Sequence, residues 1–238
     1  MARAIGLAAL IGAWCMFAPA AQSAPPQSSK ASIKVPVFPA AGPMIVPTTI
    51  ARSRPTDAAR RVEVLHEFRD DYRQQYVLAI AGHIDRHGVL WVKLRLQLRP
   101  NGTFGWIRAS AAQLSTTHNK LVVHRGRRKI DIVHNGSVVA EAPVAIGAPG
   151  RETPLGSYYV TARFVPDDPF LGVFAVETSA YSKLTEWPGG GLVGIHGTSA
   201  PQLLGQAVSH GCVRVSNATA ALLRRWAPLG TPISIVSD

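Results

Sequence analysis

Short runs in which apolar and polar residues alternate recur along the chain from residue 61 onward. The clearest covers residues 90–96, where basic side chains alternate with apolar ones as in a half-buried strand. Further β-prone runs lie at residues 61–65, 75–80, 106–107, 121–126, 127–147, 157–164, 172–178, 192–196 and 232–238. One helix is predicted over residues 218–227, with Ser216 or Asn217 as its cap and Gly230 and Pro232 ending it. Many strands and a single late helix predict a mainly β chain built around a β-sandwich.

The spacing of these runs predicts two folded parts. Residues 51–116 form a small β domain with a turn at Asn101-Gly102, and residues 119–238 form a larger one with a hairpin at Asn135-Gly136. Residues 24–50 are rich in Pro, Ala and Ser, which predicts an extended linker. Residues 166–191, rich in Pro, Gly and aromatic side chains, predict a loop or lid over one edge of the sheet.

The N-terminus has the pattern of a secretory signal peptide over residues 1–23. Arg3 precedes an apolar run at residues 4–17, and small residues suited to cleavage follow. An uncleaved anchor is the alternative, although the run is short for a spanning helix. No later stretch is long enough to span a bilayer, so we expect an exported protein of the periplasm or cell wall without stable membrane insertion after cleavage.

The formal net charge of +11 favours anionic partners through long-range attraction. Nucleic acid is not expected, because no nucleic-acid motif occurs and the signal peptide directs the chain out of the cell. An anionic envelope polymer fits this compartment better.

Of the two cysteines, Cys15 leaves with the signal peptide and Cys212 remains. The mature chain therefore cannot form an internal disulfide, and an unpaired thiol in an exported protein indicates an intermolecular bridge or a reactive group.

The segment SHGCVRVS around Cys212 distinguishes a reactive from a structural cysteine. If it is one extended strand, His210, Cys212 and Arg214 share the open face, while Val213 and Val215 face the core. Nearby positive charge is expected to lower the pKa of the thiol. The pattern therefore favours nucleophilic chemistry.

A cysteine nucleophile needs a base, and spacing alone leaves His210 and His196 both open. A zinc site formed by His196, His210 and Cys212 is a weaker alternative, since no CxxC or HExxH spacing occurs and Arg214 would repel the ion. We expect no metal and no organic cofactor.

Two motifs together resemble a known family. HGT at residues 196–198 is followed, after the twelve residues that separate His196 from Ser209, by SHGCVR, and TPLG stands upstream at residues 153–156. This combination is similar to the signature of bacterial L,D-transpeptidases with a YkuD-type catalytic domain, and the resemblance covers residues of about 119 to 237.

The resemblance implies roles for particular residues. Cys212 would be the acylated nucleophile and His196 its general base, with the Gly197 carbonyl orienting the imidazole. His210 and Gly211 would shape the site and help build an oxyanion hole with the amide of Cys212.

Further residues are implied on the substrate side. Arg214 would bind a substrate carboxylate, and Ser209 would support its strand. Four aromatic residues are candidates for the lid or donor cleft, and at least half of them are expected to be packing residues: Tyr158, Tyr159, Tyr181 and Trp187.

The family reaction acts on peptidoglycan stem peptides in cell-wall biogenesis, which maintains cell shape. Cys212 would attack the bond before the terminal D-alanine of a tetrapeptide stem and pass the acyl group to an amine. Water as acceptor would make the enzyme an L,D-carboxypeptidase. The resemblance also implies acylation by carbapenems.

Residues 51–116 are similar to a small bacterial Src-homology-3-like barrel, which suggests a wall-binding or spacer module. A non-catalytic, basic wall-binding protein is therefore a second class of function, although it leaves His196, Cys212 and Arg214 unexplained. A sortase-like transpeptidase is a further enzyme alternative, but its cysteine and arginine lie further apart.

Overall fold

The computed structural model describes residues 1–2, 35–186 and 188–238. The chain divides into two units, Met1–Ile33 and Lys34–Asp238, and the fold below is that of the second. The predicted signal peptide, apart from its first two residues, and the first part of the predicted linker lie outside the described residues.

The first half of this unit forms an N-terminal lobe around a seven-stranded sheet with the order β3-β2-β6-β5-β4-β1-β7. Its elements are β1 (Ala40–Pro43), β2 (Thr48–Arg52), β3 (Arg61–His66), β4 (Tyr76–Ile84), β5 (Leu90–Arg95), β6 (Phe104–Arg108), the 3₁₀ turn η1 (Ala109–Ala111) and β7 (Ser115–Thr116). Val92, Leu94 and Ile107 are fully buried in its core. The alternation along residues 90–96 thus places apolar side chains inside, as predicted.

The predicted linker over residues 24–50 is wrong for its last part, because β1 and the start of β2 belong to this sheet. Strand β1 pairs with β4 and with β7. A Cβ on Gly42 would lie 1.7 Å from the Gln113 carbonyl oxygen, so only glycine allows this close approach. The composition of this segment is typical of a linker, but in the fold its small residues allow the strands to pack closely.

The second half forms a C-terminal lobe around an eight-stranded sheet with the order β10-β9-β8-β17-β12-β13-β14-β16. Its elements are β8 (Asn119–His124), β9 (Lys129–His134), β10 (Ser137–Pro143), β11 (Ile146–Gly147), β12 (Gly156–Phe164), η2 (Pro169–Leu171), β13 (Ala175–Tyr181), η3 (Pro188–Gly191), β14 (Leu192–His196), η4 (Pro201–Leu203), β15 (Ala207–Ser209), β16 (Val213–Arg214), α1 (Asn217–Trp226) and β17 (Pro232–Val236). The β8–β17 and β14–β16 pairs are parallel, and β11 pairs with β15 in a separate two-stranded sheet. The prediction of a mainly β chain with one late helix is confirmed.

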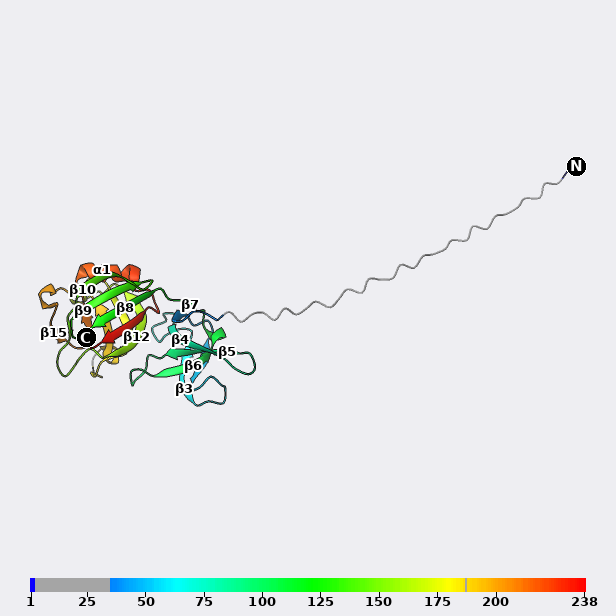
Figure 1. The fold of residues 1–238 in the computed structure, drawn as a ribbon, viewed down its shortest axis with the longest axis horizontal. Coiled ribbons are helices and arrows are strands. Elements are labelled where there is room, and N and C mark those ends of the chain that lie inside the picture. Colours follow the sequence, from blue (N-terminus) through cyan, green and yellow to red (C-terminus); the bar gives the residue numbers. More distant parts are fainter. Residues whose placement is uncertain (3–34, 187) are drawn as a thin grey trace. The chain divides into compact units, whose positions relative to one another are not determined.

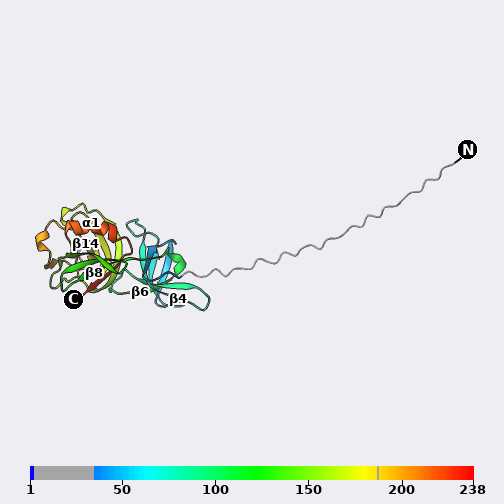
Figure 2. The same cartoon turned by 45° about the horizontal axis from the view of Figure 1, so that its top comes forward.

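Helix α1 packs on one face of the larger sheet, against β13, β14 and β9 (Figures 1 and 2). Ser216 is its cap, because the Ser216 hydroxyl accepts a hydrogen bond from the Thr219 amide at 3.1 Å. Leu223 buries the inner face of the helix, whereas Leu222 is 41% exposed. Among the described residues, no helix combines the length and the apolar character that a membrane crossing requires.

Two predictions about loops have different outcomes. The hairpin at Asn135-Gly136 is confirmed, since both residues have positive φ (48° and 81°), as a type I′ turn requires. The loop predicted over residues 166–191 is wrong in its middle, where β13 overlaps the β-prone run predicted at residues 172–178. Val176 and Ala180 on β13 are fully buried, so apolar packing overrides the loop-like composition of the flanking residues.

We expect Leu223→Ala to lower the free energy of unfolding by about 2–5 kcal/mol, because it leaves a cavity under α1 that the sheet cannot fill. Leu222→Ala is the matched control on the exposed face and should change it by less than about 0.5 kcal/mol. Urea denaturation of both variants measures the difference. Equal losses would contradict the packing of α1 described above.

Candidate active site

The parallel pairing of β14 with β16 brings together two sequence motifs. Ile195 pairs with Val213 and His196 with Arg214, so the HGT and SHGCVR segments lie side by side. The residues before these pairs, Gly194 and Cys212, are adjacent for the same reason. The backbone of Gly194 donates a hydrogen bond to the Cys212 sulfur at 3.3 Å.

Cys212 and His196 face the same position above Gly194. A Cβ placed on Gly194 would lie 3.9 Å from Cys212 Sγ and 3.9 Å from His196 Cδ2. The thiol and the imidazole therefore border one small space, and a glycine at residue 194 keeps that space open.

The ring of His196 is held by its own neighbour. Its Nδ1 lies 2.6 Å from the carbonyl oxygen of Gly197, which requires Nδ1 to carry the proton and donate it. The second ring nitrogen, Nε2, is then the basic one. The side chain is buried, with 4% of the residue exposed, and this burial lowers the pKa of His196 below its ordinary value. The imidazole is thus neutral at neutral pH.

Gly197 can only be glycine in this packing. A Cβ on it would lie 2.3 Å from the Asn217 side-chain oxygen and 3.1 Å from Gly172 Cα. The same Asn217 oxygen accepts hydrogen bonds from the amides of Val173 and Thr198, both at 3.2 Å. Asn217 therefore holds the backbone that orients His196. The sequence indicates Asn217 only as a possible helix cap, because its partners are distant in sequence.

The segment from Ser209 to Arg214 is not one continuous strand, so the predicted regular alternation is wrong. Strand β15 ends at Ser209, β16 begins at Val213, and Gly211 between them has a φ of +118°. The Ser209 hydroxyl donates to the Cys212 carbonyl at 2.6 Å and accepts from the Gly211 amide at 3.1 Å. Ser209 thus shapes the bend that presents Cys212.

The two faces of this segment also differ from expectation in part. Val213 and Val215 are fully buried in the core, as predicted. Arg214 is only 7% exposed, however, so it does not lie on an open face, whereas Cys212 is partly buried. The pairing of β16 with β14, and of Arg214 with Ala145, encloses the arginine.

The expected lowering of the thiol pKa is wrong. Burial raises the pKa of Cys212 above its ordinary value, and it outweighs the opposite effects of the Gly194 amide and the Arg214 charge. Because burial also keeps His196 neutral, the resting pair is a thiol beside a neutral imidazole rather than a thiolate beside an imidazolium.

The buried guanidinium of Arg214 has at least one hydrogen-bond donor that no described residue uses. Among the described residues, its buried Nε has no hydrogen-bond partner. Its guanidinium lies 4.6 Å from the centre of the Phe170 ring, and burial lowers its pKa. A buried guanidinium with an unused donor is suited to a carboxylate ligand.

The remaining predicted residues lie around this centre. His210 is half-buried, and burial together with the charges of Arg151 and Arg214 lowers its pKa. Tyr181 ends β13 and lines a cleft of about 590 Å³. Of the other aromatic candidates, Tyr158 and Tyr159 are core residues, and Trp187 lies outside the described residues.

Thr153 of the TPLG turn is tied directly to the bend. Its hydroxyl donates to the Gly211 carbonyl at 2.9 Å and accepts from the Gly147 amide at 2.9 Å. The TPLG motif is evident in the sequence, but the contact of Thr153 with Gly211 spans 58 residues and only the fold brings the two together.

The described part of the chain contains no group of three His, Cys, Asp or Glu side chains that could hold a metal ion. The three residues considered as zinc ligands, His196, His210 and Cys212, therefore do not form such a cluster.

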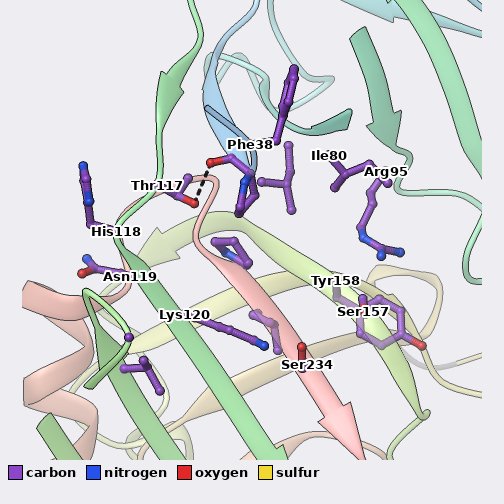
Figure 3. A pocket seen from close by; sticks show the side chains of 16 residues that line it. Phe38, Ile80, Arg95, Thr117, His118, Asn119, Lys120, Ser157, Tyr158 and Ser234 are labelled. Carbon is purple, nitrogen blue, oxygen red and sulfur yellow. Dashed lines mark hydrogen bonds between the residues drawn. The ribbon is translucent and has the colours of Figure 1, made fainter. Parts of the chain in front are cut away.

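A different cavity, of about 460 Å³, is lined by residues of both lobes (Figure 3). Phe38 and Arg95 line it from the N-terminal lobe, and Lys120, Tyr158 and Ser234 from the C-terminal lobe. Among the described residues, Tyr158 is the one predicted candidate that lines it, and neither Cys212 nor His196 does.

Comparisons with known proteins agree with this arrangement of motifs. Residues 118–235 match the family model of the L,D-transpeptidase catalytic domain, YkuD. The YkuD protein of Bacillus subtilis (strain 168) is 31% identical over 116 residues, which cover 48% of this chain and 64% of that protein. L,D-transpeptidase 1 of Mycobacterium tuberculosis (strain H37Rv) is 30% identical over 118 residues, which cover 44% of this chain and 45% of that protein.

These alignments span less than two thirds of either relative. Among solved structures, an L,D-transpeptidase from Mycobacterium smegmatis aligns with 69% of this chain and 91% of its own, at 16% identity and a TM-score of 0.45. The sequence matches cover the segment that carries both motifs of the site. Residues 118–235 of this chain are thus similar to a YkuD-type L,D-transpeptidase catalytic domain.

Proposed function

We propose that the protein is an exported peptidoglycan L,D-transpeptidase with Cys212 as nucleophile and His196 as general base. The observation that carries the proposal is the 2.6 Å hydrogen bond from His196 Nδ1 to the Gly197 carbonyl, because it leaves the basic Nε2 on the ring that borders the Cys212 thiol. The match of the family model to residues 118–235 supports the same reading.

In the first step, Nε2 of His196 takes the thiol proton as Sγ of Cys212 attacks the carbonyl before the terminal D-alanine of a tetrapeptide stem. The tetrahedral intermediate collapses with cleavage of the C–N bond. His196 returns its proton to the leaving nitrogen, so D-alanine departs as a neutral amine and a thioester remains on Cys212.

In the second step, an amine of a neighbouring stem attacks the thioester carbonyl. His196 accepts one proton from this amine and returns it to the departing sulfur, which restores the thiol and neutral imidazole. The product is a cross-link between the third residues of two stems. Because the Cys212 thiol and the His196 imidazole are both neutral at rest, opposite charges are present in the buried site only during the reaction.

The proposed charge stabilisation follows from the bend before Cys212. The amide of Gly211 is already engaged with Ser209, so the oxyanion hole relies on the amide of Cys212, with His210 and Gly211 shaping the site around it. Arg214, with its unused buried donor, would bind a substrate carboxylate.

The acceptor defines the alternatives to this proposal. Water would make the protein an L,D-carboxypeptidase, and a protein amine would attach that protein to the wall. The alternative outside the enzymes is a non-catalytic protein that binds the cell wall. In that case the N-terminal lobe would be a Src-homology-3-like binding module. The proposed location is the periplasm or cell wall.

We expect Cys212→Ala to lower cross-linking at least about 10³-fold, because no other group replaces the nucleophile. The thermal unfolding midpoint should change by no more than about 2 °C, since a small, partly buried side chain is removed. The assay incubates tetrapeptide muropeptides with the purified protein and detects, by mass spectrometry, dimers that have lost one D-alanine.

Leu222→Ala, on the exposed face of α1, is the control and should keep full activity. Tripeptide monomers without dimers would favour the carboxypeptidase. If Cys212→Ala retained full function in the cell and the wild type produced neither product, the non-catalytic alternative would be preferred.

The rate of acylation by a carbapenem such as imipenem is expected to fall in acid, with an apparent pKa below 6.5. The reactive form needs neutral His196, and burial depresses its pKa, so activity persists to a lower pH than an ordinary histidine would allow. No loss is expected up to about pH 9, because deprotonation of the thiol yields a stronger nucleophile. Stopped-flow acylation across pH 4–9 measures this profile.

Substituting each histidine in turn shows which of the two is the general base. We expect His196→Ala to slow acylation by about 10²–10⁴-fold and His210→Ala to slow it far less, because only the first is held with Nε2 as its basic nitrogen beside the thiol. The reverse order of effects would assign the base to His210.

A further inference from the structure

A hairpin of the N-terminal lobe contacts both ends of the loop between β13 and β14. The guanidinium of Arg99 donates to the Ser182 carbonyl at 2.9 Å, where the loop begins, and to the Gly190 carbonyl at 2.8 Å, where it ends. The side chain of Asn101 donates to the Tyr181 carbonyl at 2.7 Å and accepts from the Tyr181 amide at 2.9 Å. Four hydrogen bonds from two side chains thus fix the base of this loop.

The contact is closely packed as well as polar. Arg99 also stacks over the Tyr181 ring, 4.7 Å from its centre. The base of the loop is closed by a hydrogen bond from the Ser182 amide to the Gly191 carbonyl at 2.8 Å. A Cβ on Gly191 would lie 2.9 Å from the Arg99 guanidinium, so the hairpin and the loop meet without a gap.

Both ends of the loop lead directly to the reactive pair. At one end, Ser182 packs on the bend before the nucleophile, since a Cβ on Gly211 would lie 2.9 Å from Ser182 Cβ. At the other end the chain enters β14, whose last residue is His196. A shift at the base of this loop therefore moves the surroundings of both Cys212 and His196.

A second contact anchors the same lobe to β13. Arg69 forms an ion pair with Glu177 at 2.8 Å and donates to the Thr161 carbonyl at 3.2 Å. Glu177 is paired in the sheet with Gly194, whose amide binds the Cys212 sulfur. The hairpin is thus carried by a lobe that is itself fixed to the strand behind the thiol.

We propose that Arg99 and Asn101 are positioning residues for the Cys212 site, so that the N-terminal lobe completes the active site of the C-terminal lobe. The inference rests on the proposed function for its catalytic readout. The two residues also line the cleft of about 590 Å³, together with Leu155, Ser182 and Lys183, and thereby determine one wall of the approach beside the bend.

The test uses the full-length protein carrying Cys15→Ser, so that Cys212 is its one thiol. The variants are Asn101→Ala, Arg99→Ala and Arg99→Lys. The lysine variant keeps the charge but has a single ammonium, which cannot serve two carbonyls in the manner of a guanidinium. Arg108→Ala is the matched control, because it removes an exposed arginine of the same lobe whose partner is Asp57.

Two readouts are compared at a temperature at which circular dichroism shows each variant fully folded. Imipenem acylation is expected to slow about tenfold in all three variants, because the nucleophile is less well positioned. Alkylation of Cys212 by iodoacetamide is expected to accelerate ~fivefold, because the thiol is less buried. Arg108→Ala should match the parent in both.

Unchanged rates of acylation and alkylation in Asn101→Ala and Arg99→Ala would overturn the proposal. If Arg99→Lys had the same acylation and alkylation rates as the parent protein, the role of the two hydrogen bonds from Arg99 to the Ser182 and Gly190 carbonyls would be overturned. Failure of the proposed function can be told apart from failure of this proposal. If the parent protein is neither acylated nor active on muropeptides, the proposed function is wrong. The alkylation rates of the variants still show whether the hairpin positions Cys212.

Discussion

The hydrogen bond from His196 Nδ1 to the Gly197 carbonyl is the constraint on which the site depends. It selects one tautomer of the imidazole and therefore decides which nitrogen is basic. It also requires the Gly197 backbone to stay in place, which the close packing of Asn217 and Gly172 ensures. In the proposed mechanism, this backbone carbonyl has the orienting role that a carboxylate has in a Ser-His-Asp triad, without adding a negative charge to a buried site.

The absence of a carboxylate from this arrangement agrees with the electrostatics of the pair. Burial raises the pKa of Cys212 and lowers that of His196, so both shifts favour neutral groups at rest. The charge of Arg214 acts on both side chains, and the lowered pKa of its guanidinium reflects the same desolvation. A carboxylate ligand would supply the negative charge that this buried cation lacks.

The two lobes are connected through β13. Strand β13 pairs with β14, which carries His196, and its Glu177 and Tyr181 bond to side chains of the N-terminal lobe. The loop that follows β13 then packs on Gly211. The proposed coupling of the N-terminal lobe to the thiol would pass through the side chains of Arg69 and Asn101 and then through the pairing of β13 with β14.

The sequence by itself determined the strands around residues 61–107, the late helix and the two motifs that contain His196 and Cys212. These features depend on local alternation, turn residues and short spacing, which are present in a linear chain. Only the tertiary structure decided that β1 is a strand, that burial raises the Cys212 pKa, and that Asn101 bonds to Tyr181. Each of these depends on residues far apart in sequence, because burial and close packing arise only when distant segments meet.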